Sequence, residues 1–196
     1  MEVFQQKFSQ VDIHAASKHL GGQWLSVTSD DMPNGLLAWD KVLVNTSVGI
    51  LEITAHTQVR SFEGASDDYA CLTLRSSDGT HTTMTSTRSS LFHGRGETVK
   101  SIWVLRDFLT AAQIDGESYQ YVADVGLAFE LSTQWIAISL ASHRTEAICV
   151  SRAPTKSELE LPHLEDRWTS TTLERFDYRR EWILLNLEGV GQPGNE

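Results

Sequence analysis

Basic residues are scarce in this chain of 196 residues, which has 16 Lys and Arg against 26 Asp and Glu and a formal net charge of −10. The acidity is distributed, because each of the segments 1–90, 91–150 and 151–196 is net negative. A nucleic-acid-binding surface needs clustered basic residues to neutralise phosphates, so we expect no nucleic-acid partner. A distributed acidic surface suits a basic protein partner, and it also serves solubility alone.

Long apolar runs and cysteines are also rare. The apolar stretches fall well short of the roughly 18 residues that a membrane helix needs. The opening MEVFQQKFSQ lacks the basic start and apolar core of a signal peptide. The two cysteines, Cys71 and Cys149, stand in apolar surroundings, which predicts buried free thiols, with one disulfide as the alternative. We therefore expect a cytoplasmic protein without membrane association.

Apolar residues are nonetheless sufficient for a core, since they make up 40% of the chain and include six Trp and seven Phe. At the N-terminus, Phe4, Phe8, Val11 and Ala15 recur at helical spacing, and Gly21–Gly22 provides a natural stop. This pattern predicts an N-terminal helix.

From Gln23 onward the pattern indicates β-strands bounded by turn residues. Ser47–Gly49 predicts a tight connection between two short strands, and Asp78–Gly79 predicts a hairpin turn. A flexible linker over 76–90 is the alternative to that hairpin. The expected strand-rich segments are 24–27, 41–55, 69–76, 101–108, 116–131, 133–142 and 146–151.

The C-terminal segment 172–187 fits either a helix or two strands, 174–178 and 181–187, that turn at Arg179–Arg180. Because hairpin signals are frequent and no βαβ rhythm is visible, we expect a mainly β fold, an antiparallel sandwich or barrel. An N-terminal helix would accompany it, together with a C-terminal helix if 172–187 is helical, and an α+β fold is the alternative.

The two halves of the chain resemble each other weakly. At a shift of 85 residues, 42–54 lies over 127–139, and a nearby alignment places Cys71 over Cys149. We interpret 1–196 as a single compact unit with pseudo-repeat halves 1–90 and 91–196, or else as strand-rich halves that agree by chance.

Catalytic, cofactor and metal motifs are weak. The loop LFHGRGETVKSIWV, 91–104, has two glycines but precedes a strand, so it predicts a turn and no phosphate site. The histidines lack the close pairs of structural zinc sites, and the best metal candidate, His163 with Glu165 and Asp166, also fits a polar turn. Cys149 and His143 could form a nucleophile pair, but an apolar run around Cys149 favours an inert thiol. We expect no cofactor and no metal.

Aromatic and basic residues in charged company are the best binding candidates. Trp39, Trp168 and Trp182 have charged neighbours, and Arg179 belongs to a basic-aromatic cluster. Such residues are typical of interface anchors, although a Trp at the edge of a core looks the same.

The sequence favours a non-catalytic acidic binding protein that recognises another, basic protein, in the manner of a bacterial inhibitor or immunity protein. The alternative is a small-ligand-binding protein or enzyme whose site is assembled from His143, His163, Glu165 and Asp166. Nothing in the sequence indicates an oligomeric state.

Overall fold

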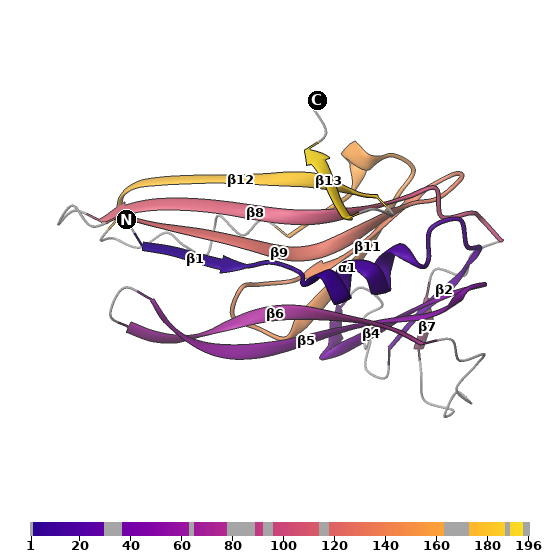
Figure 1. The fold of residues 1–196 in the computed structure, drawn as a ribbon, viewed down its shortest axis with the longest axis horizontal. Coiled ribbons are helices and arrows are strands. Elements are labelled where there is room, and N and C mark those ends of the chain that lie inside the picture. Colours follow the sequence, from indigo (N-terminus) through magenta and orange to yellow (C-terminus); the bar gives the residue numbers. More distant parts are fainter. Residues whose placement is uncertain are drawn as a thin grey trace.

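The computed structural model describes residues 2–29, 37–62, 65–77, 89–91, 96–113, 118–162, 173–186 and 189–193. Two sheets pack together, as predicted, in a mainly β fold with an N-terminal helix (Figure 1). All the described strand pairs are antiparallel except the one between β1 and β9.

The five-stranded sheet contains, in spatial order, β6 (Ala65–Ser77), β5 (Gly49–Phe62), β4 (Lys41–Thr46), β2 (Trp24–Ser29) and β7 (Ser89–Leu91). The eight-stranded sheet contains β13 (Gly189–Pro193), β12 (Leu173–Asn186), β8 (Ser101–Gln113), β9 (Ser118–Glu130), β10 (Trp135–Leu140), β11 (Ala147–Ala153) and β3 (Leu37–Trp39) in that order, with β1 (Glu2–Gln6) beside β9.

The N-terminal helix is shorter than predicted. Helix α1 covers Gln10–Ser17 and begins at a capping box, in which Ser9 and Asp12 each accept a hydrogen bond from the other's backbone N–H. Phe4 instead lies in strand β1, where it pairs with Tyr121 of β9. The helical spacing that included Phe4 was therefore wrong, because strand pairing with a distant segment overrides local periodicity.

Two further expectations concern turns. The turn at Ser47 is confirmed, since β4 and β5 pair from Thr46 opposite Gly49, although β5 is long. In the C-terminal segment β12 is one continuous strand through Arg179 and Arg180, so neither a helix nor a turn forms there. Asp78–Gly79 lies outside the described residues, and the strand that follows, β7, pairs with β2.

The core lies between the sheets and joins both halves of the chain. Trp24 of β2 meets Phe129 of β9 edge to face, with ring centroids 5.2 Å apart, and both side chains are fully buried. The connection between β10 and β11 also reaches the other sheet, since the N–H of Ala70 donates to the carbonyl of His143 at 2.7 Å. These contacts hold the eight-stranded sheet in place over the five-stranded one.

Candidate functional site

A groove lies along strand β11 near the β3 end of the eight-stranded sheet. Alternation along β11 buries Ile148 and Val150 in the core between the sheets and leaves Cys149 and Ser151 on the opposite face. On that face Cys149 and Ser151 form the floor of the groove, with Leu37 of β3 beside Cys149. The volume of the groove is about 710 Å³.

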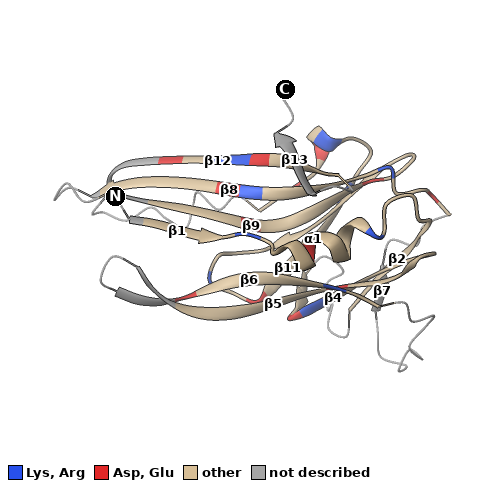
Figure 2. Ribbon diagram, in the orientation of Figure 1, with Lys and Arg blue, Asp and Glu red and all other residues tan. Residues whose placement is uncertain are grey.

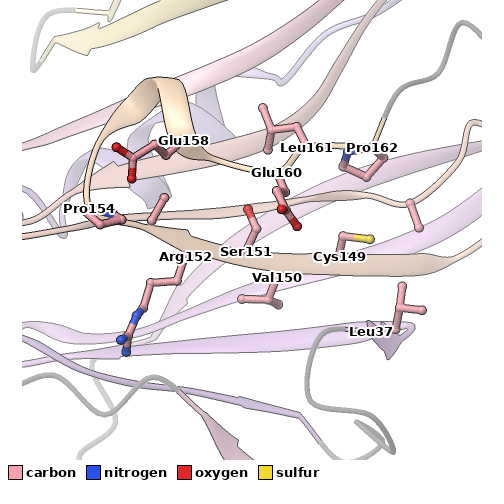
Figure 3. Close-up of a pocket in the computed structure, with 12 residues that line it drawn as sticks. Leu37, Cys149, Val150, Ser151, Arg152, Pro154, Glu158, Glu160, Leu161 and Pro162 are labelled. Atoms are coloured by element: carbon pink, nitrogen blue, oxygen red, sulfur yellow. The ribbon is translucent and has the colours of Figure 1, made fainter.

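The segment 154–162, which we call the strap, forms the opposite wall. It follows β11 directly and contains the short 3-10 turn η1 (Lys156–Glu158). Figure 3 shows the strap folding back over β11, with Glu160 extending toward Ser151 and Cys149, whereas Arg152 points away from the strap. Pro154 and Pro162 lie at the two ends of the strap, and both line the groove.

The lining of the groove is mainly apolar, and two carboxylates against one guanidinium, that of Arg152, leave its rim acidic. Leu37, Leu161 and the prolines supply apolar surface, while Glu158 and Glu160 on the strap are exposed carboxylates. Such a surface suits a segment that combines an apolar side chain with a positive charge. Figure 2 shows acidic and basic residues scattered elsewhere over both sheets.

Trp39, one of the predicted binding residues, lies on the face that carries the groove. It pairs with Ala147 as Leu37 pairs with Cys149, and residues two apart on a strand share a face. Trp39 and Leu37 are 50% and 39% exposed, so two large apolar side chains lie next to each other on this face in contact with solvent.

The other predicted binding residues lie elsewhere. Trp182 and Arg179 are both in β12, which β8, β9 and β10 separate from β11 and β3, and their side chains point to opposite faces of the sheet. Arg179 is exposed, pairs with Glu181 and lies over the Phe108 ring, 4.3 Å from its centroid. Trp168 lies outside the described residues. The structure therefore does not gather the four residues into one site.

Sequence reasoning missed Leu37, Glu158 and Glu160. The strap was visible only as a charged stretch between two prolines, and a fold-back over β11 has no periodic signature. The alternation of SELEL was the one available signal, because it places Glu158 and Glu160 two residues apart.

Polar side chains are also buried on β8 and on β9, one of its two neighbouring strands, and β12 is the other neighbour. Asp107, fully buried, accepts two hydrogen bonds from the Arg180 guanidinium, at 2.6 and 3.0 Å. The imidazole of His143 lies between the side chains of Tyr121 on β9 and Asp107 on β8. Its Nδ1 is 3.0 Å from the Tyr121 hydroxyl, and its Nε2 is 3.8 Å from Asp107 Oδ2.

Burial dominates the protonation of this cluster. It raises the pKa of the Asp107 carboxyl, and hydrogen bonds from Arg180 oppose that rise. Burial and the nearby Asp107 charge raise the pKa of Tyr121 well above its usual value, so its phenol stays protonated at neutral pH. Since Asp107, Tyr121 and His143 are each 3% exposed or less, and none of them lines the groove, the cluster holds strands together.

The two thiols are separate, and neither is in a disulfide. Cys71 is buried, as predicted, with its sulfur 3.0 Å from Nε2 of His56 on the neighbouring strand β5. Cys149 is half-buried and lines the groove, which corrects the expectation that it is buried. His163, Glu165 and Asp166 lie outside the described residues. Within the ranges that are described, His, Cys, Asp and Glu side chains do not gather in threes that could hold a metal ion.

None of the helical structure in the described part of the chain is both long and apolar enough to cross a membrane. No protein-family model, curated protein or solved structure matches the chain.

Proposed function

We propose that this chain is a non-catalytic binding protein that recognises a basic segment of another protein, as bacterial inhibitor and immunity proteins do. The observation that carries the proposal is the groove itself, which combines a mainly apolar lining and an acidic rim with exposed Leu37 and Trp39 on the same face. Interfaces use such aromatic and aliphatic anchors at their centre and charged residues at the rim.

The charge of the chain supports the same partner. A net charge of −10 attracts a basic protein at long range, and Glu158 and Glu160 place negative charge where the partner would dock. Electrostatic complementarity of this kind accelerates encounter and disfavours acidic competitors.

The alternative function, a small-ligand site or active site built from histidines, has less support among the described residues. A histidine-lined pocket would favour it, but none of the histidines in the described part of the chain lines the groove. His143, the candidate that the structure describes, is buried beside Tyr121 and Asp107.

The test is to select binders to the purified chain from a displayed library of random peptides. We expect the enriched peptides to be basic, and to lose at least about tenfold in affinity against Leu37→Asp or against Glu158→Lys/Glu160→Lys. Val11→Asp is the matched control, because Val11 is 75% exposed on α1 and does not line the groove. The affinity of the enriched peptides for Val11→Asp should stay within about twofold of that for wild type.

Salt dependence provides a second readout, since raising ionic strength should weaken binding through the acidic rim. The proposal is wrong if the enriched peptides are acidic, or if they bind Leu37→Asp as tightly as wild type. A thermal shift produced by a small metabolite, with no peptide enriched, would favour the alternative function.

A further inference from the structure

Three tryptophans form a cluster on the face of the eight-stranded sheet that the strap crosses. They are Trp103 of β8, Trp135 of β10 and Trp182 of β12, and all three are half-buried. The Trp103 and Trp135 ring centroids are 6.3 Å apart, and those of Trp135 and Trp182 are 6.2 Å apart at an interplanar angle of 81°. We call these three residues the tryptophan cage.

The cage holds a cation from the chain itself. The ammonium of Lys156, in the strap, lies 4.7 Å from the Trp103 ring centroid and 4.8 Å from that of Trp182. Both distances fall within the range of about 6 Å in which the negative face of an indole attracts a cation. The Trp103 and Trp182 rings therefore both attract the Lys156 ammonium.

Hydrogen bonds orient Trp103, one of the three rings of the tryptophan cage. The Trp103 indole Nε1 donates to the Ser101 hydroxyl at 2.8 Å, and that hydroxyl donates to the Glu130 carboxylate at 2.6 Å. Glu130 is also the cross-strand partner of Trp135. The position of the Trp103 ring is thus fixed before a cation binds, and the Glu130 carboxylate adds negative charge nearby.

The turn that carries Lys156 has little stability of its own, although Leu159 and Leu161 after it pack against the same hydrophobic cluster as the tryptophans. Turn η1 has three residues, none of them buried, and Thr155 provides no side-chain cap for it. Short 3-10 turns have little stability of their own. The lysine can therefore leave the cage without unfolding a strand, whereas the tryptophans belong to three paired strands.

We propose that the tryptophan cage is a binding site for alkylammonium cations and that Lys156 occupies it as an intramolecular ligand. A quaternary ammonium suits the cage better than a lysine, because its methyl groups contact the rings and its charge is less strongly hydrated. This inference does not depend on the groove, because neither Lys156 nor any of the three tryptophans lines it.

The experiment is a tryptophan-fluorescence titration with tetramethylammonium chloride at an ionic strength kept constant with NaCl. In Lys156→Ala we expect a saturable change with half-saturation at about 1–10 mM. Wild type should require about tenfold more, because Lys156 competes for the same rings. Lys41→Ala, which removes a lysine from the other sheet, is the charge-matched control and should behave as wild type.

A second substitution locates the site. Adding Trp182→Leu to Lys156→Ala should abolish the saturable change, whereas adding Trp39→Leu should leave it unaltered. If Lys156→Ala does not fold, Lys156→Gln serves in its place, since it removes the charge and keeps most of the side-chain length.

Two results would overturn the inference. One is a Lys156→Ala titration that is linear and matches NaCl alone, since the cage would then hold no free cation. The other is equal half-saturation for wild type and Lys156→Ala, since Lys156 would then not occupy the site.

Discussion

The two sheets share a four-stranded antiparallel meander, β2–β4–β5–β6 in one and β8–β9–β10–β11 in the other. In the first, Val44 pairs with Leu51, and in the second, Phe129 pairs with Ile136, with each member of the second pair 85 residues after its counterpart. A duplicated supersecondary unit would produce this agreement, and the duplication stays a prediction.

The meanders differ in what lies beyond the shared hairpin. Strand β4 has six residues, whereas β9 has 13 and continues past β10 to pair with β1. The extension carries Tyr121 and Asp124, and the buried Asp107 lies opposite it on β8. The shared hairpin builds the core, whereas the extension of β9 lies beside the buried charges.

The largest expected effect concerns the buried charges. Asp107→Ala leaves the Arg180 guanidinium buried without its carboxylate, which should lower the free energy of unfolding by about 3–5 kcal/mol. Glu52→Ala, in the five-stranded sheet, should cost about 0–1 kcal/mol, because its 3.8 Å pair with Lys41 is more than a third exposed. Urea denaturation measures both.

The double substitution Asp107→Leu/Arg180→Met should recover most of that loss, since it leaves no unpaired charge. Equal losses for Asp107→Ala and Glu52→Ala would remove the contrast between the two sheets.

The next prediction tests whether the matching hairpins of the two meanders, β4–β5 and β9–β10, contribute equally to the stability of the core. Leu51→Ala and Ile136→Ala each delete a fully buried side chain at matching places in the two hairpins, so each should cost about 2–5 kcal/mol. The two values should agree within about 1 kcal/mol if the hairpins contribute equally to one core. A loss confined to one of them, in thermal or urea unfolding, would show that the sheets are not equivalent.

Patterning from the sequence predicted the turn at Ser47 and the mainly β fold, because alternation and turn residues act locally. It failed at Phe4, where pairing with Tyr121 on a distant strand decides the structure. Trp182 was predicted as a binding residue, which stays a prediction, and its contact with the Lys156 ammonium was missed. The strap fold-back that unites them depends on contacts between segments, which no local pattern encodes.

A smaller effect is expected at Gly126, where the part of β9 that has no counterpart in β4 begins. A Cβ on Gly126 would lie 2.5 Å from the Ile138 carbonyl oxygen, at the point where β9 bulges between Leu105 and Arg106 of β8. Gly126→Ala should therefore cost about 1–3 kcal/mol. The counterpart 85 residues earlier, Lys41, begins its strand, and Lys41→Ala should stay within about 0.5 kcal/mol of wild type. Thermal unfolding of the pair measures the difference, and equal values would contradict the role given to Gly126.

The smallest effect is pH-dependent and belongs to the five-stranded sheet. Burial, with a smaller contribution from the charge of Lys18, lowers the pKa of His19 to about 4 from its usual 6.5. His19 lies between the hydroxyls of Thr46 and Ser76, at 2.8 and 3.2 Å. Between these pH values the unfolded chain binds a proton that the folded chain does not, so stability falls as the pH decreases from 6.5 toward 4.

The variant His19→Gln should remove about 1–2 kcal/mol of that pH-dependent loss, as seen by comparing urea midpoints at about pH 6.5 and about pH 5. An unchanged difference between wild type and variant across the window would show that His19 does not titrate there.

The central claim is that the face formed by β3, β11 and the strap binds a basic segment, and amide hydrogen exchange tests it most directly. Exchange would be followed with and without a selected basic peptide at saturation. We predict slower exchange in Leu37–Trp39, Ala147–Ala153 and the strap, with β5 and β6 unchanged. Protection confined to β5 and β6, with the groove unaffected, would contradict the account.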